Sequence, residues 1–383
     1  MTTTADDEFR TIESAAAPTR FARGWHCLGL AETFKDGKPH QVKAFGTELV
    51  VFQSESDGKL NVLDAYCRHM GGNLAKGTVK GDSIACPFHD WRWGGNGRCT
   101  GIPYARRVPP VAKTRTWHAM ERNAQLFVWH DPQGSRPTDE VTIPEIEGVG
   151  SDEWTDWTWN SIVVEGSHCR EIIDNVVDMA HFFYVHYSFP TFFKNIFEGP
   201  VAGQIMHSVP RDDIQVGSHY DDPDSRLESE AYYHGPSYMI DYLTSYAQGM
   251  VIETVLINCH YPISDNAFVL QYGAMVKKVP GMAEEAAAGM AAQFAQGVEV
   301  GFEQDVEIWK DKTPIDNPLL SEEDGPVYQL RRWYQQFYVD VEDVTEDMTN
   351  RFEFEIDTTR AVESWKAEVA ENISAGRVMD TTV

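Results

Sequence analysis

Two Cys–His pairs place the strongest constraint on how this chain can fold. The first pair is Cys67-Arg-His69 and the second is Cys86-Pro-Phe-His89, with sixteen residues between them. Thiolates and imidazoles are ligands for transition metals, and four of them on two loops indicate one shared centre. The fold must therefore hold two loops side by side, with all four ligand side chains directed at the same point.

Two kinds of metal centre use such a ligand set. A zinc ion would take all four side chains in a tetrahedron. In a Rieske centre, two thiolates hold one iron of a [2Fe–2S] cluster and two imidazoles hold the other. Each loop here offers one Cys and one His, which suits an elongated cluster, whereas zinc modules more often take Cys-x-x-Cys pairs from single loops. The spacing favours the Rieske centre, and Trp91 and Trp93 are expected to shield it from water.

A second metal motif lies in the segment from Asn175 to His186, which carries one carboxylate and two imidazoles in an apolar, aromatic stretch. Asp178 and His181 share one face of a regular helix. His181 and His186 would lie about 140° apart on that helix. Both can reach one ion only if the helix widens locally or ends before His186. The alternative is that both are core histidines satisfied by backbone groups.

Composition limits the class of protein. The 383 residues are enough for two domains, and 42% of them are hydrophobic, as in a globular protein. The formal net charge of −27, from 32 basic and 59 acidic residues, argues against nucleic acid or an anionic membrane as a partner. The sequence shows no signal peptide and no apolar run of membrane-spanning length, and its six cysteines suit reduced thiols. These features predict a cytoplasmic protein.

The chain divides into three parts. Residues 1–19 are expected to be a flexible N-terminus, and 20–135 an all-β domain of short strands separated by turns. Residues 136–383 are expected to form an α+β catalytic domain, with an antiparallel sheet covered by helices in a helix-grip (START-like) arrangement. Within it the pattern predicts helices over 170–186, 281–310 and 359–375, and strands over 234–242, 251–260, 267–277 and 351–356.

Taken together, Cys-x-His, Cys-x-x-His and Asn-x-x-Asp-x-x-His-x-x-x-x-His resemble the motifs of the terminal oxygenase subunit of Rieske non-haem iron oxygenases. The resemblance runs from about Trp25 to the end of the chain. It implies a [2Fe–2S] cluster on the two Cys–His pairs. It also implies a mononuclear Fe(II) held by His181, His186 and a later acidic residue, a two-His-one-carboxylate arrangement.

The third iron ligand is predicted from helix phase. Phe302, Asp305 and Trp309 stand at i, i+3 and i+7, which is one helical stripe. An acid between two aromatic residues on an inward face suits a ligand at the back of an apolar pocket. Glu303 and Glu307 lie off the stripe, so we expect Asp305 to be the ligand and Glu307 to be the main alternative.

Asp178 and Asn175, which open the second motif, are expected to be catalytic residues. The Asp178 carboxylate can accept the second N–H of His181 and so fix the ring. The family resemblance implies that it also touches a cluster-ligand histidine of the neighbouring subunit, as an electron bridge, in a homotrimer. The alternative is that Asp178 only orients the histidine.

Within the family the chain most resembles the oxygenase component of 3-ketosteroid 9α-hydroxylase, in its length, its Cys67–Leu74 loop, its Asn175–His186 run and its acidic tail. That resemblance implies a monooxygenase of bacterial steroid and cholesterol breakdown, hydroxylating carbon 9 on the α face with O2. Electrons would come from NADH through a separate reductase carrying flavin and a [2Fe–2S] cluster. The alternatives are O-demethylation or dihydroxylation of an aromatic compound, and a Rieske electron carrier without chemistry of its own.

The substrate pocket is expected to be apolar with few hydrogen-bonding groups, which suits a bulky, uncharged molecule. The candidate pocket residues are Val176, Gln204, Tyr232, Asn258, Phe302 and Trp309.

Overall fold

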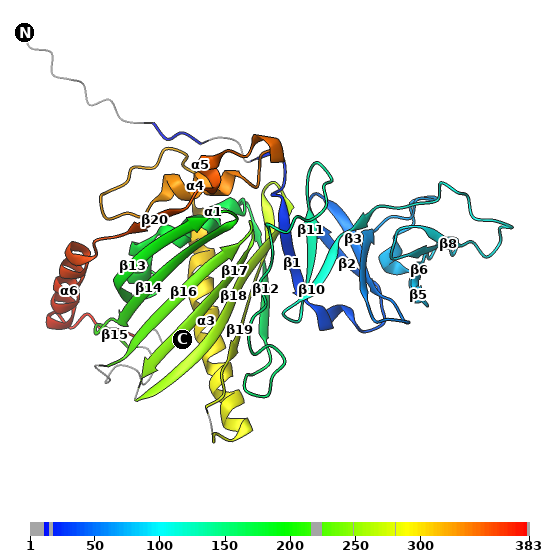
Figure 1. Ribbon diagram of the computed structural model, residues 1–383. Helices are drawn as coiled ribbons and strands as arrows, with labels where there is room; N and C mark the ends of the chain where they lie inside the picture. The colour runs from blue at the N-terminus through cyan, green and yellow to red at the C-terminus, as the bar shows by residue number, and fades with distance from the viewer. Residues whose placement is uncertain (1–10, 15–17, 216–223, 248, 280, 381–383) are drawn as a thin grey trace, which may run out of the picture.

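The computed structural model describes residues 11–14, 18–215, 224–247, 249–279 and 281–380, and shows an N-terminal β domain beside a larger domain built on one long sheet (Figure 1). The β domain contains three small sheets, with strand orders β1-β11-β10, β2-β3-β4-β9 and β5-β6-β7-β8. Its strands are β1 (Gly24–Leu30), β2 (His40–Ala44), β3 (Thr47–Gln53), β4 (Leu60–Asp64), β5 (Thr78–Lys80), β6 (Ser83–Ala85), β7 (Arg92–Gly94), β8 (Cys99–Gly101), β9 (Thr116–Trp117), β10 (Ala119–Arg122) and β11 (Gln125–His130), with 3-10 turns η1 (Ala31–Phe34) and η2 (Leu74–Lys76).

The second domain is organised on an eight-stranded antiparallel sheet, in the order β12-β19-β18-β17-β16-β14-β13-β20. Most neighbours in the sheet are also neighbours in the sequence, so hairpins build its centre. The strands are β12 (Thr158–Glu165), β13 (Ser188–Glu198), β14 (Val201–Pro210), β16 (Arg226–His234), β17 (Tyr238–Ala247), β18 (Met250–Ser264), β19 (Ala267–Val276) and β20 (Phe352–Glu355). A separate short parallel pair joins β15 (Ile214–Gln215) to β21 (Met379–Asp380).

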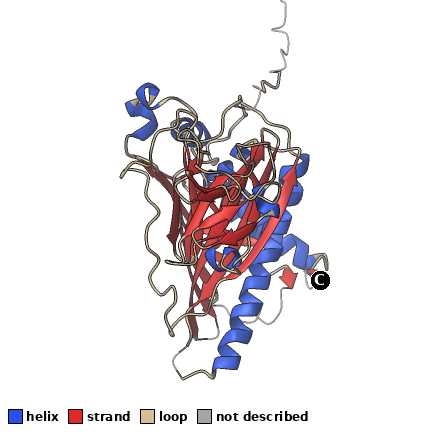
Figure 2. Cartoon of the chain, turned by 90° about the vertical axis from the view of Figure 1, so that its right-hand side faces the viewer, coloured by secondary structure: helices blue, strands red, loops and turns tan. Residues whose placement is uncertain are grey.

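Helices cover one face of this sheet, and the longest of them, α3, lies along it (Figure 2). Apolar side chains of α3, including Val306 and Trp309, pack against Val164 of β12 and Phe268 and Leu270 of β19. The helices are α1 (Arg170–Ile173), η3 (Asp174–Val177), α2 (Met179–Tyr184), α3 (Glu284–Asp311), α4 (Val327–Gln335), η5 (Val341–Asp343), α5 (Glu346–Thr349) and α6 (Thr359–Ser374).

The opposite face of the sheet packs against the β domain. Alternate residues of β18 point to opposite faces: Ile257 and Cys259 join Trp25 and Phe127 in one apolar cluster, whereas Leu256 and Asn258 face the helices. A hydrogen bond from Gln271 Nε2 to the Cys27 carbonyl, 3.0 Å long, also joins the domains. Both faces of the central strands are therefore buried, which explains their long apolar runs.

The α+β fold class expected from the sequence is confirmed, but one predicted helix is wrong. Residues 170–186 form a broken segment, in which α1 continues as η3 and a new helix, α2, begins after Asp178. Asp178 adopts φ −91° and ψ 92°, and its side chain accepts a hydrogen bond from the His181 amide. An aspartate in this conformation is a helix N-cap, so the chain starts a second helix where the periodicity predicted one continuous helix.

The predicted flexible N-terminus is only partly described. Residues 1–10 and 15–17 lie outside the described residues. Residues 11–14, by contrast, are held against the second domain: the Glu13 amide donates to Asn317 Oδ1 at 3.0 Å, and the Asp316 amide donates to the Glu13 carbonyl at 2.7 Å. This short stretch is therefore anchored rather than free.

All six cysteines are buried and none is in a disulfide, as expected from the sequence for Cys27, Cys99, Cys169 and Cys259 as small buried side chains. Among the described helices, none has the length and apolar character needed to span a membrane.

Candidate functional site: two metal centres and an apolar cavity

The four predicted cluster ligands lie on two matching turns. Cys67 follows β4 and Cys86 follows β6, and in each turn the cysteine carbonyl accepts a backbone N–H from four residues ahead, Gly71 and Asp90 respectively, at 2.9 Å. These turns bring the His69 and His89 rings to a centroid distance of 4.8 Å. Both cysteines are buried and both histidines are half-buried.

The arrangement fits a [2Fe–2S] cluster on three counts. The Nδ1 atom of His89 is buried and has no hydrogen-bond partner among the described residues, so a metal would satisfy it. A Cβ atom on Gly72 would lie 2.6 Å from the Cys86 sulfur, so only glycine lets the two turns approach this closely. Trp91 stacks on the His69 ring at 4.5 Å, with 9° between the planes.

Trp93 shapes the environment of the Cys67 sulfur. Its indole Nε1–H donates to Cys67 Sγ at 3.3 Å. Burial raises the pKa of the Cys67 thiol, and the His69 amide and the Trp93 indole oppose that rise by stabilising the thiolate. Hydrogen bonds to a ligand sulfur raise the reduction potential of an iron–sulfur cluster, so Trp93 would raise the potential of a cluster held here without being one of its ligands.

We predict that His89→Ala removes the visible Rieske spectrum but leaves the second iron site loaded, because the two sites share no ligand. Absorption spectroscopy combined with iron analysis of the purified variant tests this. A wild-type protein that contains one zinc and no visible chromophore would contradict the cluster assignment.

The second site is assembled at the end of α2. The helix ends at Tyr184, two residues before His186. The two histidines therefore come together because the helix ends, and not because it widens. The following residue, Tyr187, has φ 55°, which marks the sharp change of direction into β13. The Arg211 guanidinium supports this end of the helix by donating to the Phe183 carbonyl at 2.9 Å.

One ligand atom from each of His181, His186 and Asp305 lies within 4.8 Å of the other two. Of these atoms, His186 Nε2 and Asp305 Oδ2 are 3.4 Å apart. Three ligands so placed form one face around a single ion, the arrangement typical of non-haem Fe(II) oxygenases. The structure places Asp305 inside this group with only 7% of its surface exposed, whereas the alternative ligand, Glu307, is exposed on the outer side of α3.

The ring of His181 is oriented by a backbone group. Its Nδ1 donates to the Asp178 carbonyl oxygen in a short hydrogen bond, which leaves Nε2 free to bind a metal. Burial lowers the pKa of His181 and keeps the ring in the neutral form that a metal requires.

The expected contact between the Asp178 carboxylate and the His181 ring is therefore wrong. Asp178 Oδ1 lies 3.9 Å from His181 Nδ1, beyond hydrogen-bonding distance, and instead accepts the His181 amide at 3.2 Å. The carboxylate is used as the N-cap of α2, while its own backbone carbonyl fixes the ring. About half of the Asp178 side chain remains exposed.

A cavity of about 680 Å³ opens next to the three candidate ligands, between α2, α3 and the sheet. This volume lies within the range of ordinary ligand pockets. Asn175 also lines it and accepts a hydrogen bond from Trp309 Nε1 at 3.4 Å. Five of the six predicted pocket residues are on its wall: Val176, Gln204, Asn258, Phe302 and Trp309.

Tyr232 does not line this cavity, and the prediction for it is wrong. Its ring covers Gly203 of the adjacent strand, while the next residue, Tyr233, faces the cavity. Successive residues of a strand point to opposite faces, so a one-residue error in phase exchanges the two tyrosines.

Sequence reasoning also missed Asp241 on β17, although an acid within the apolar run of residues 238–243 was a visible signal.

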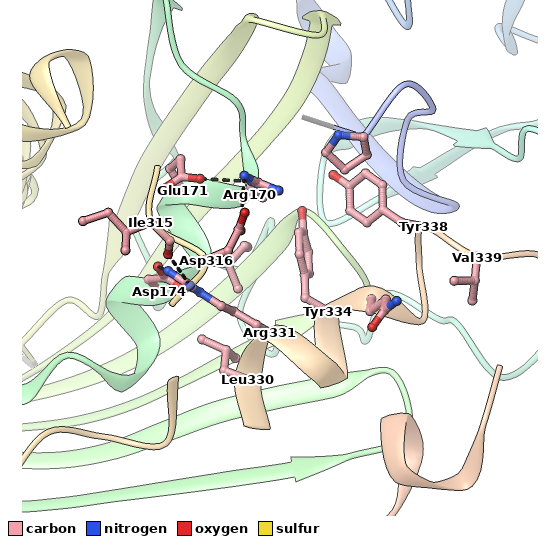
Figure 3. A pocket seen from close by; sticks show the side chains of 13 residues that line it. Arg170, Glu171, Asp174, Ile315, Asp316, Leu330, Arg331, Tyr334, Tyr338 and Val339 are labelled. Carbon is pink, nitrogen blue, oxygen red and sulfur yellow. Dashed lines mark hydrogen bonds and ion pairs between the residues drawn. The ribbon is translucent and has the colours of Figure 1, made fainter. Parts of the chain in front are cut away.

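A second, smaller cavity of about 360 Å³ lies behind the ligand-bearing segment, between α1 and α4 (Figure 3). The labelled charged side chains pair with one another across it. Arg331 donates to both carboxylate oxygens of Asp174, at 3.1 and 2.7 Å, and Lys312 lies within ion-pair distance of Glu171 and Asp174. These pairs hold α1 and η3 in place behind the iron site.

Comparisons with known proteins agree with this geometry. Residues 24–113 match the Rieske [2Fe–2S] domain, and residues 128–338 match the 3-ketosteroid 9alpha-hydroxylase C-terminal domain. Among solved structures, dicamba monooxygenase bound to dicamba has a TM-score of 0.63 at 17% identity, covering 84% of this chain and 98% of that one. NdmA of Pseudomonas putida CBB5 with caffeine has a TM-score of 0.66 at 16% identity, covering 88% and 97%. The fold and the two sites define a Rieske-type terminal oxygenase.

Curated relatives narrow the class. The chain is 73% identical, over 96% of its length and 94% of the relative, to a 3-ketosteroid-9-alpha-monooxygenase oxygenase component of Rhodococcus rhodochrous. It is 58% identical, over 97% and 96%, to the protein of the same description from Mycobacterium tuberculosis strain H37Rv. The chain therefore belongs to the 3-ketosteroid-9-alpha-monooxygenase oxygenase component family, an enzyme family whose cofactors are a Rieske cluster and a mononuclear iron.

Proposed function

We propose that the protein hydroxylates a 3-ketosteroid at carbon 9, on the α face, with O2 and with electrons from NADH delivered by a separate reductase that carries flavin and a [2Fe–2S] cluster. The single observation that carries this proposal is a large, mostly apolar cavity that ends at the His181–His186–Asp305 group. A rigid hydrocarbon with few polar groups fits such a cavity, because burying it leaves few unpaired polar atoms. The relatives that share most of the sequence carry the corresponding description.

The chain's own residues hold and orient the reacting groups. When bound, the cluster supplies electrons and the mononuclear iron supplies O2 activation. His181, His186 and Asp305 would hold the iron, and all three side chains line the cavity. Phe302 and Trp309 form apolar walls beside Asp305 and exclude water from the reacting carbon.

The protein is proposed to act as a homotrimer in which electrons cross between subunits. In one chain, the second cluster turn follows β6, at the end of the β domain away from the second domain, whereas α3, which carries Asp305, lies along the long sheet of the second domain (Figure 1). The apolar side chains Met70 and Phe88, each next to a cluster-ligand histidine, are 63% and 58% exposed. Exposed apolar groups at such a position suit a docking surface, and a neighbour's cluster docked at the half-exposed Asp178 would give the short route that one chain lacks.

Asp178→Asn tests this route. The amide retains the N-cap, because its oxygen accepts the His181 amide, but the negative charge is lost. We predict that the variant keeps both metal sites and binds substrate. Cluster oxidation should slow by about 10- to 100-fold in single-turnover stopped-flow measurements with O2 and substrate, the scale on which loss of a group beside a metal ligand reduces activity. Wild-type oxidation rates, or a fully active monomer, would remove the bridging role.

The activity itself is tested by product analysis. The purified oxygenase is incubated with reductase, NADH, O2 and a panel of 3-ketosteroids and methoxylated aromatic acids, and the products are identified by mass spectrometry and NMR. A 9α-hydroxysteroid is the expected product. Turnover confined to the aromatic substrates would overturn the proposal.

A cytoplasmic location, supported by six cysteines outside any disulfide, belongs to the same proposal.

A further inference from the structure

Asp241 places a carboxyl group in the floor of the substrate cavity, where little balances a negative charge. It lies on β17, is 7% exposed, and lines the cavity opposite the helices. None of the described residues that line the cavity is a lysine or an arginine. Burial raises the pKa of Asp241 to about 7, against the lowering effect of the Ser229 hydroxyl. A substantial share of the protein therefore carries Asp241 as a neutral acid near pH 7.

The hydrogen bonding of Asp241 leaves one oxygen unused. Ser229 Oγ donates to Oδ1 at 2.8 Å, which fixes the plane of the carboxyl group. Within the described part of the chain, Oδ2 has no hydrogen-bond partner. Because Oδ1 already accepts a hydrogen bond, the proton of the neutral acid belongs on Oδ2. The group then offers one oriented donor to the cavity.

Asp241 sits at a fixed place relative to the other polar groups of the floor. In the sheet register, Gln204 of β14 pairs with Ala231 of β16, and Ala231 pairs with Asp241. The two polar residues are therefore two strands apart, roughly 10 Å, on the same face. The candidate iron ligands come from α2, from the second residue after its end and from α3, on the other side of the cavity. A contact with Asp241 therefore holds one end of a rigid ligand on the side of the cavity opposite the candidate iron ligands.

We propose that neutral Asp241 donates a hydrogen bond from Oδ2 to the 3-keto oxygen of the steroid. This hydrogen bond orients the steroid in the cavity relative to the iron site. This inference rests on the proposed function, and it names the group that selects the ketone. A ketone oxygen only accepts hydrogen bonds, so it complements a lone donor. A steroid without that oxygen leaves the donor unpaired in an apolar cavity, which is a strong basis for discrimination.

The experiment compares two steroids that differ only at carbon 3, a 3-ketosteroid and its 3-deoxy counterpart. Binding to the holoenzyme is followed by quenching of tryptophan fluorescence, since Trp309 lines the cavity. We expect the wild type to bind the ketone at least about tenfold more tightly, the scale of one hydrogen bond. Asp241→Leu should abolish this preference. Asp241→Asn, which keeps an N–H donor, should retain it.

The possible outcomes separate the two proposals. If the wild type binds neither steroid, the proposed function fails. If the wild type prefers the ketone and Asp241→Leu keeps that preference, Asp241 is not the donor. The same conclusion follows if the preference tracks the carbon-17 oxygen in a matched 17-deoxy pair.

A spectroscopic measurement makes the test independent of how well Asp241→Leu folds. In isotope-edited infrared spectra of a steroid labelled with ¹³C at carbon 3, the bound carbonyl of the wild type should absorb at lower frequency than in an apolar solvent. The shift should be smaller in Asp241→Asn, because an amide is a weaker donor than a carboxylic acid. An unshifted carbonyl band in the wild type would overturn the inference.

Discussion

Asp305→Ala is expected to remove the mononuclear iron and to reduce steroid hydroxylation by about 10³-fold or more, a loss equivalent to the several kcal/mol that a bound metal contributes. Asp305 is the only carboxylate in the three-residue group that the described structure brings together, and its Oδ2 lies 3.4 Å from His186 Nε2. Two imidazoles alone hold Fe(II) weakly and leave its charge uncompensated. The Rieske spectrum should persist, because the cluster ligands lie in the other domain.

The matched control is Glu307→Ala, two residues further along α3. The Glu307 side chain is 75% exposed and pairs with Lys310 at 2.9 Å, so its removal should leave iron content and turnover unchanged. Iron is measured in both variants by mass spectrometry of the metal, alongside their visible and circular dichroism spectra. Full iron content in Asp305→Ala, or iron loss in Glu307→Ala, would move the ligand to the alternative residue.

Features determined by short-range spacing could be predicted from the sequence. The two Cys–His turns and the Phe302–Asp305–Trp309 stripe depend on local geometry, and the structure assembles each as its spacing implied. The two alternatives for bringing His181 and His186 together were also visible in the spacing. Only the structure shows that the helix ends before His186.

Features that depend on strand phase or on long-range packing could not be predicted. In Tyr232-Tyr233 the two residues are alike, so composition cannot tell which one faces the cavity, and only the register of β16 decides it. The sequence indicates Asp178 as a partner for the His181 ring, but the structure uses its carboxylate as the N-cap of α2, and the cap determines where that carboxylate lies. The packing of the β domain on the second face of the sheet joins Trp25 to Ile257, residues far apart in sequence.

Lowering the pH from 7.5 to 5.5 is expected to reduce the free energy of unfolding by about 4 kcal/mol, because three histidines are buried near the interface between the domains. His26 and His260 are each 1% exposed, and His130 is 7% exposed. Burial lowers the pKa of His26 and of His260 to about 3, and that of His130 to about 4, from an ordinary value of 6.5. Each ring is therefore neutral in the folded protein at pH 5.5.

The direction of this pH effect on stability follows from proton binding. Between pH 6.5 and the folded-state pKa values of about 3 to 4, the unfolded chain binds protons that the folded chain excludes. Acid in this range therefore favours unfolding. The stabilisation is fully present above pH 6.5 and is lost progressively as the pH falls, with each histidine contributing about 1.4 kcal/mol at one pH unit below 6.5.

His260→Leu isolates one of these contributions. Both ring nitrogens of His260 lack a hydrogen-bond partner among the described residues, so leucine removes the titrating group without breaking a hydrogen bond. Urea unfolding at pH 7.5, 6.5 and 5.5 should show a pH slope shallower than that of the wild type by about 1.4 kcal/mol per pH unit below 6.5, the value for one proton. His118→Gln, which removes an exposed imidazole, is the control and should leave the slope unchanged. Acid effects on the cluster are common to all three proteins, so a wild-type slope in His260→Leu would show that this histidine is not excluded from protonation in the folded state.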